Sequence, residues 1–241
     1  MELEPSNLGG HIHRQYDEEL EAIRTRVLAM GGLVEEQITK ALRALREQDG
    51  ELGEGVATDD YKVNDLEVSI DEDCTRIIAL RQPAAGDLRM VVAIIKTITD
   101  LERIGDEAEK IGRMASRLAG TQYSPQQMNG VQHLGDRVSK MVHDALDAFA
   151  RLDVNAALQV VREDSTVDVE YESLMRTLMT FMMEDPRQIA NAMDIIWCAR
   201  ALERVGDHAK NICEYLIYLV KGKDVRHTSL EQMEREANAL G

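Results

Sequence analysis

Two pairs of carboxylates, each four residues apart, are the residues of this chain whose types and spacing could do chemistry. Glu102 precedes Asp106 and Glu203 precedes Asp207, in segments that read Leu-Glu-Arg-Ile-Gly-Asp and Leu-Glu-Arg-Val-Gly-Asp. On a helix this spacing places both carboxylates on one face, about 5–6 Å apart at Cβ, where their oxygens could bind one hard cation. Acidic pairs are usually plain solvated surface, but this one occurs twice beside an apolar stripe. We therefore predict a metal site at each pair.

Further carboxylates precede each pair along the chain and could complete an oxygen-rich site. In the first half they are Glu67 and Asp71, again four apart, and in the second half Asp168 and Glu172. The two sets are out of register, so the two sites are not expected to be identical. Such donors suit Fe, Mn, Mg or Ca. The same stretches hold more oxygen donors, at Asp60, Asn64 and Asp164.

Three other polar side chains lie next to these carboxylates. Arg103 and Arg204 follow the two glutamates and could neutralise the local charge or, if turned outward, bind an anion. A solvated arginine in a surface ion pair is the more ordinary role. His208 could add a nitrogen ligand to the second site, whereas Glu107 stands at the matching position of the first.

Sequence motifs of the common catalytic classes are not found. The chain has no Gly-rich phosphate loop, no Gly-x-Ser-x-Gly and no His-Glu-x-x-His, and no histidine follows a glutamate by three residues, as a di-iron carboxylate site requires. Cys74, Cys198 and Cys213 form neither a disulfide framework nor a zinc motif. We favour a non-catalytic protein. A metal-dependent hydrolase or phosphatase using the carboxylate clusters is the alternative.

Long helices must position these residues. Hydrophobic residues make up 44% of the chain but aromatic residues only 4%, a composition that favours helices over strands. Apolar or small residues recur at a 4-3-4-3 spacing over residues 94–119 and again over 195–220, 101 positions later. Upstream matches, such as Asp60 with Asp164, occur at an offset of 104. These offsets indicate an internal duplication.

We expect an all-α protein of two pseudo-symmetric three-helix bundles, because short loops between long helices return each helix alongside the last. The predicted helices cover residues 12–47, 55–81, 86–119, 126–152, 155–184 and 187–221. The first bundle is expected over residues 8–120, the second over 125–222, and a weakly structured tail over 223–241. Gly50, Gly53 and Gly55 should loosen the first connection. Long helices with apolar stripes can also pair between subunits, so we expect a homodimer.

The formal net charge of the 241 residues is −16, from 28 basic and 44 acidic residues. An acidic body of this kind argues against binding to nucleic acid or to an anionic membrane surface. No apolar run approaches the roughly 20 residues that span a bilayer, and the acidic start of the chain does not look like a signal peptide. We expect a cytoplasmic protein without direct membrane insertion.

A resemblance to a known family rests on the run Gln-Pro-Ala-Ala-Gly-Asp-Leu-Arg at residues 82–89, on Ile-Ile-Lys-Thr at 94–97 and on the two Leu-Glu-Arg-x-Gly-Asp segments. Together with the length, the helical duplication and the acidity, these motifs resemble the PhoU family of phosphate-signalling regulators. The similarity covers residues from about 8 to about 228.

The resemblance implies a non-enzymatic negative regulator of phosphate uptake and of the phosphate-starvation response. It implies an adaptor that contacts the sensor histidine kinase of the phosphate regulon and the ATPase subunit of the phosphate ABC transporter, and that reaches the membrane only through these partners. Family members bind metal ions at Glu/Asp-x-x-x-Asp motifs. That property carries over to Glu102 with Asp106 and to Glu203 with Asp207, and less directly to Glu67 with Asp71. The metal, among Fe, Mn, Zn or Mg, stays open.

Overall fold

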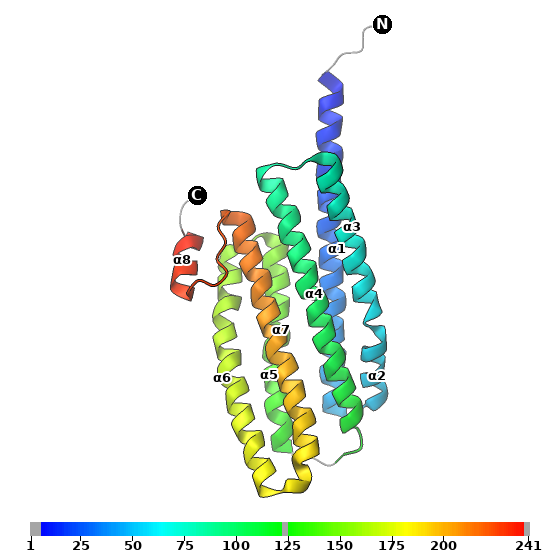
Figure 1. Cartoon of the computed structure of the whole chain (residues 1–241), viewed down its shortest axis with the longest axis vertical. Coiled ribbons are helices and arrows are strands. Elements are labelled where there is room, and N and C mark those ends of the chain that lie inside the picture. Colours follow the sequence, from blue (N-terminus) through cyan, green and yellow to red (C-terminus); the bar gives the residue numbers. More distant parts are fainter. Residues whose placement is uncertain (1–5, 122–124, 239–241) are drawn as a thin grey trace.

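The computed structural model describes the backbone of residues 6–121 and 125–238, and the side chains of residues 18–121 and 128–237. Every regular element in these ranges is helical, which confirms the all-α prediction (Figure 1). In chain order the elements are α1 (Ser6–Glu47), α2 (Gly50–Asp59), α3 (Tyr61–Arg81), α4 (Ala85–Leu118), α5 (Pro125–Arg151), α6 (Val154–Glu184), the 3₁₀ turn η1 (Pro186–Gln188), α7 (Ile189–Lys221) and α8 (Leu230–Asn238).

The long helices run side by side, with α4 and α7 next to each other in the middle of the molecule (Figure 1). In the first half α4 packs against α1, α2 and α3, and in the second half α7 packs against α5 and α6. The two halves meet along α4 and α7, which share the most extensive helix contact, and along α1 and α5. None of the described helices has the length and apolar character needed to cross a bilayer.

The apolar stripes predicted from the spacing form the centre of both halves. In α4 the stripe is buried from Ile94 to Ala115, and in α7 from Ile195 to Leu216. Val220, at the end of the second stripe, is 41% exposed instead. The duplicated spacing therefore marks the two helices that hold the halves together.

The turns that join the first two helices of each half repeat one another in detail. Gln48 and Leu152 end α1 and α5 in the left-handed region, with φ of 55° and 54°. The next residues, Asp49 and Asp153, each donate their N–H to the carbonyl five residues back at 3.0 Å, as in a Schellman motif. Their carboxylates then cap α2 and α6. Each turn is only two residues long, so the following helix must return antiparallel.

The predicted helix over residues 55–81 is in fact two helices that meet at Asp60. Asp60 keeps helical dihedral angles (φ −59°, ψ −30°), but its carbonyl accepts from Val63 at 2.9 Å, as in a 3₁₀ turn. No proline or glycine marks the break, and the apolar spacing continues through it. This break could therefore not be predicted from the spacing.

The three glycines expected to loosen the first connection lie inside α2 instead. Gly53 crosses Gly112 of α4 so closely that a Cβ on Gly53 would lie 2.6 Å from the carbonyl oxygen of Gly112, and a Cβ on Gly112 would lie 2.7 Å from that of Gly53. Gly55, on the open side of α2, has no neighbour within 4 Å of such a Cβ. At the crossing, glycine permits close backbone contact.

The tail after Gly222 is more ordered than expected, because it contains α8. Met233 and Ala237 of α8 are buried together with Val225, and Arg162 of α6 donates to Glu234 at 2.8 Å. The apolar residues of α8 recur at i, i+3 and i+7, which is the spacing of one helix face. The segment is otherwise very polar, so this short apolar stripe is difficult to recognise in the sequence.

Candidate functional site

Three carboxylates of the first half meet where α3 begins beside the middle of α4. Asp60 stands at the α2–α3 break, and Asp106 and Glu109 lie one turn apart on α4. One oxygen atom from each of the three lies within 4.8 Å of the others. Asp60 is buried, and the other two are half-buried. This acidic triad has the donor type and spacing that a hard cation requires.

Two amide groups hold Asp60 in place. Gln37 of α1 donates to Asp60 Oδ1 at 3.3 Å, and Asn64 of α3 donates to Oδ2 at 3.1 Å. The oxygen atoms of both amides are buried without a hydrogen-bond partner among the described residues. Buried oxygens of this kind are themselves ligands for hard cations. The surroundings of Asp60 therefore fit a metal ion.

Gly105 makes room for these groups, rather than for an ion directly. A Cβ on Gly105 would lie 3.0 Å from Asp60 Oδ1 and 3.2 Å from Gln37 Oε1. A side chain at this position would push the carboxylate and the amide away from α4. The glycine between the predicted ligands is thus explained by protein neighbours.

Burial and, after it, mutual repulsion raise the pKa values of three first-half carboxylates. Burial is the largest cause for Glu102, Asp106 and Glu67. After burial, the charge of Asp106 raises the pKa of Glu102, that of Asp60 raises the pKa of Asp106, and that of Asp71 raises the pKa of Glu67. A bound cation would relieve this repulsion.

The structure brings the predicted residues of the first half together, with one addition. Asp106 belongs to the acidic triad, and Glu102, Glu67 and Asp71 lie near it, close enough that neighbouring charges raise the pKa values of Glu102 and Glu67. Glu109 was not predicted. Its position three residues after Asp106 could have revealed it, since that spacing also shares a helix face.

The second half carries a lysine inside its acidic cluster. Asp164, the counterpart of Asp60, is buried, and Lys210 Nζ lies 2.6 Å from its Oδ2. Burial is the first cause of the raised pKa values of Asp207 and Asp168, and the charge of Asp164 is the second. Burial followed by Asp207 raises the pKa of Glu203. A protein cation therefore already offsets the negative charge here.

Two of the second-half residues face elsewhere. Glu172 is exposed and pairs with Arg176 on its own helix at 3.6 Å. His208 Nδ1 lies 2.6 Å from Oδ1 of Asp100 on α4, which also accepts from Asn211 at 3.1 Å. His208 thus links α7 to α4 at the contact between the two halves, which we call the seam.

Glu107 and Arg204 also join the two halves. Arg204 Nε lies 2.9 Å from Oε1 of buried Glu107, and Lys110 Nζ lies 2.9 Å from the same oxygen. Of the two arginines that follow the glutamates, Arg204 is therefore tied to the opposite half. Arg103 is exposed.

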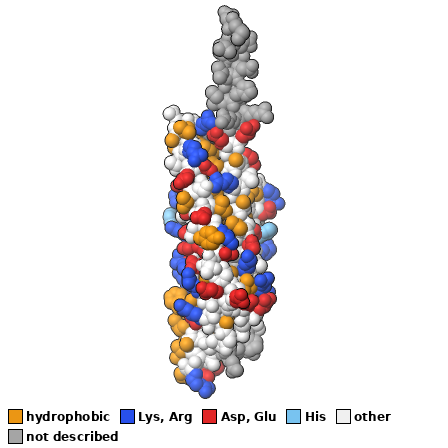
Figure 2. All heavy atoms as spheres, turned by 90° about the vertical axis from the view of Figure 1, so that its right-hand side faces the viewer, with side chains coloured by type: hydrophobic (Ala, Val, Ile, Leu, Met, Phe, Trp, Pro, Cys, Tyr) orange, Lys and Arg blue, Asp and Glu red, His pale blue; other side chains and the backbone are white. Residues whose placement is uncertain are grey.

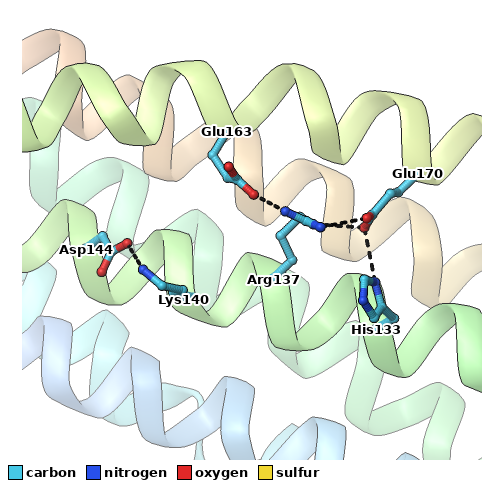
Figure 3. Close-up of polar contacts among 6 residues, drawn as sticks. All are labelled: His133, Arg137, Lys140, Asp144, Glu163 and Glu170. Carbon is cyan, nitrogen blue, oxygen red and sulfur yellow. Dashed lines mark hydrogen bonds and ion pairs between the residues drawn. The ribbon is translucent and has the colours of Figure 1, made fainter.

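A cavity of about 600 Å³ lies between α5 and α6. Most of the charged side chains in and beside its walls form ion pairs with one another (Figure 3). Arg137 reaches between two carboxylates of α6, Glu163 and Glu170, and bonds Glu170 at 2.8 and 3.0 Å. His133 approaches the same Glu170 at 3.5 Å, and Lys140 pairs with Asp144 along α5. The contacts of Arg137 and His133 bind α5 to α6.

The cysteines are unsuited to covalent chemistry. All three are buried and free. Burial raises the pKa of Cys74 to about 12, and it also raises the pKa values of Cys198 and Cys213. A thiol in such surroundings is not a nucleophile at neutral pH.

A comparison with protein families finds the PhoU domain twice along the chain, at residues 27–115 and 131–216. The second match begins 104 residues after the first and ends 101 residues after it, since 131 − 27 = 104 and 216 − 115 = 101. These are the two offsets of the internal duplication.

Curated relatives match over nearly the whole chain. The chain is 50% identical over 234 residues to the "Phosphate-specific transport system accessory protein PhoU homolog" of Pseudomonas aeruginosa, covering 97% of both proteins. It is 48% identical over 233 residues to the "Phosphate-specific transport system accessory protein PhoU" of Escherichia coli (strain K12), covering 97% of this chain and 96% of the relative.

Solved structures share the fold. The crystal structure of PhoU from Pseudomonas aeruginosa superposes with a TM-score of 0.84 at 51% identity, over 86% of this chain and all of the other. The phosphate transport system regulatory protein PhoU from Streptococcus pneumoniae superposes with a TM-score of 0.81 at 32% identity, over 87% of this chain and 99% of the other.

Proposed function

This chain belongs to the PhoU family, and from that premise we propose that it is a non-catalytic accessory protein of a phosphate-specific transport system. The observation that carries the proposal is the match of the whole chain, at about half identity, to relatives named for that role. The family is one of transport accessory and regulatory proteins, not of enzymes.

The finer part of the proposal is that the protein restrains phosphate uptake and the phosphate-starvation response when phosphate is ample. It would do so as a cytoplasmic homodimer, by contacting the ATPase subunit of the phosphate transporter and the sensor histidine kinase of the phosphate regulon. The name of the Streptococcus pneumoniae protein, a phosphate transport system regulatory protein, supports a regulatory role.

Exposed apolar side chains support a role in binding partner proteins. Five of them lie near the α6–α7 connection, at Met179, Met183, Ile189, Met193 and Trp197. On α7 they are four residues apart, so they share one helix face. Figure 2 shows apolar side chains gathered along one edge at the lower end of the molecule. Methionine-rich surfaces of this kind adapt to partner helices.

We also propose that the acidic triad binds a metal ion, with Glu102 beside it. The support is the set of oxygen donors: the triad, in which Arg113 pairs with Glu109 alone, and the buried amide oxygens of Gln37 and Asn64. Bound there, Fe, Mn, Zn or Mg would supply positive charge that stabilises the packing of α3 on α4. Glu203 and Asp207 would form a weaker site, because Lys210 already pairs with Asp164.

A gene deletion tests the regulatory proposal. Loss of this protein should raise expression of phosphate-regulon genes in high-phosphate medium, measured with a reporter, and the wild-type gene should restore repression. An unchanged reporter in the deletion strain would overturn the regulatory role.

An activity assay separates the adaptor from the hydrolase alternative. We expect the purified, metal-loaded protein to show no turnover of phosphate esters above that of Asp106→Asn. Metal-dependent hydrolysis that disappears in Asp106→Asn and persists in Glu172→Gln would contradict a non-catalytic role.

A further inference from the structure

A group of basic side chains lines an open cavity on α7, although the protein as a whole is acidic. The cavity measures about 600 Å³ and lies between the outer face of α7 and the turn at residues 226–228. Its walls include Arg200, Arg204, Lys210 and Arg226, together with His208 and Thr228. We call these six residues the basic pocket. Asp207 and Glu214 also line the cavity, with Asn211, Tyr215 and His227.

Three of the four cations of the basic pocket, Arg200, Arg204 and Lys210, lie outside more buried acidic partners. Arg204 has 47% of its side chain exposed, whereas its partner Glu107 has 4% exposed. Lys210 and Arg200 likewise lie outside their more buried partners, Asp164 and Glu203. These partners therefore hold the three cations in place from the more buried side, while parts of the basic groups stay exposed. A guanidinium has five donors, so one carboxylate leaves others free.

His208 also lines the cavity, and one of its ring nitrogens is buried without a partner among the described residues. Its side chain is almost fully buried, with the residue 6% exposed, and its Nδ1 edge faces Asp100 across the seam. Nε2, at the other edge of the ring, is buried without a partner among the described residues. Buried polar atoms normally have a hydrogen-bond partner, and a bound ligand would supply one to this nitrogen.

The positions equivalent to four pocket residues carry different charges in the first half. Along α4, 101 positions earlier, stand Thr99, Arg103, Glu107 and Glu109 in place of Arg200, Arg204, His208 and Lys210. Only Arg103 in this set is basic. The first half has carboxylates in place of His208 and Lys210 and a threonine in place of Arg200, so the two faces differ in charge.

We propose that the basic pocket binds a phosphate-type oxyanion, either orthophosphate or the phosphate group of a larger molecule. Arginine side chains match such oxyanions with pairs of donors, and Lys210 and Thr228 add single donors. Glu214 favours phosphate over sulfate, because phosphate keeps a proton near neutral pH that a carboxylate can accept, whereas sulfate has none.

The inference stands on the pocket alone and does not depend on the regulatory proposal. A reporter that stays unchanged on gene deletion would leave it intact, because binding is measured on the purified protein. In the same way, a protein that binds no phosphate could still act as an adaptor.

Calorimetric titration of the full chain tests the proposal. The protein is purified without phosphate and kept in chelator, so that no metal bridges the anion. Separate titrations use orthophosphate, pyrophosphate, ATP and sulfate. We expect saturable binding of at least one of the phosphate compounds and much weaker binding of sulfate.

Three variants locate the binding. Arg204→Gln and Arg226→Gln should each weaken it by at least about tenfold, the loss expected from one charge-assisted hydrogen bond. Arg103→Gln is the matched control, because it removes an exposed arginine at the position of the first half that corresponds to Arg204, and it should change nothing. Arg226 pairs with neighbouring Asp224 near the surface, so its variant stays informative if Arg204→Gln fails to fold.

Each outcome decides the proposal. Orthophosphate binding that depends on Arg204 or Arg226 supports it, and tighter pyrophosphate or ATP binding with the same dependence supports it for a larger ligand. It is overturned if no phosphate compound binds at millimolar concentration, if sulfate binds equally well, or if Arg103→Gln weakens binding as much as the pocket variants.

Discussion

Lys210 occupies in α7 the position that Glu109 occupies in α4, and its ammonium group lies 2.6 Å from Asp164, the counterpart of Asp60. The duplicated helices thus place opposite charges at equivalent points beside equivalent aspartates. In the first half Glu109 enlarges an acidic cluster. In the second half Lys210 neutralises one.

Reversing the charge of Lys210 should destabilise the metal-free protein. In Lys210→Glu the buried Asp164 loses its partner and gains a like charge, so we expect the free energy of unfolding in chelator to fall by about 1–3 kcal/mol. Urea titration measures it. Lys140→Glu, on an exposed lysine that pairs only with Asp144 of its own helix, should change stability far less. Equal losses in both variants would show that the buried pair has no special role.

Neutralising Asp106 should lower metal content and also stabilise the metal-free protein. Because burial and neighbouring charges raise the pKa of Asp106, Asp106→Asn removes repulsion, and we expect a gain in unfolding free energy below about 1 kcal/mol in chelator. Elemental analysis should show less bound metal. Glu172→Gln, at an exposed position, should alter neither quantity. Metal content that is unchanged in Asp106→Asn would exclude this carboxylate as a ligand.

Glu214 should make stability depend on pH. Burial raises its pKa from 4.5 to about 7, so the folded state binds this proton more tightly than the unfolded state. Stability should therefore decrease as pH rises from about 4.5 to about 7 and then level off. In Glu214→Gln this decrease should be smaller, because only the carboxylates with smaller pKa shifts still contribute to it, with a gain of about 2 kcal/mol at pH 8. Urea titrations at several pH values in chelator measure it, and Glu184→Gln, at an exposed position, should keep the wild-type slope.

Two glycine substitutions in the first half should act in opposite directions. In Gly112→Ala the new Cβ would meet the carbonyl oxygen of Gly53 at 2.7 Å, so α2 and α4 must separate and stability should fall by about 1–3 kcal/mol. Gly55→Ala has open space around it and should gain about 0.5–1 kcal/mol from the better helix former. Thermal unfolding measures both. If Gly112→Ala leaves the stability unchanged, α2 and α4 can move apart at this crossing at little cost in free energy.

Much of the fold could be predicted from the sequence because periodicity reports burial directly. The stripes of α4 and α7 and the two offsets of the duplication are visible in residue types alone. The break at Asp60 is not, since the residue keeps helical angles and the apolar spacing runs through it. The role of Gly53 depends on which helix crosses α2, and no local pattern carries that information.

Part of the candidate site could also be predicted, because residue spacing shows which side chains share a helix face. Glu102 and Asp106 share a helix face by spacing alone. Their meeting with Asp60 depends on how α3 packs against α4, and the neutralisation of Asp164 by Lys210 depends on side-chain reach between helices. An alignment of the two halves places Lys210 at the position equivalent to Glu109. The difference in charge between the two sites could therefore be predicted from the sequence, although the contacts could not.

The two-residue turns of each half have a consequence for the order of folding. They keep contacting helices close in sequence, and such local contacts form quickly, whereas contacts such as Asp100 with His208 join residues 108 positions apart. During synthesis the first half therefore closes before α7 exists. Until α7 arrives, Asp100 and Glu107 of α4 lack their partners His208 and Arg204, so these two contacts can form only after the second half has been made.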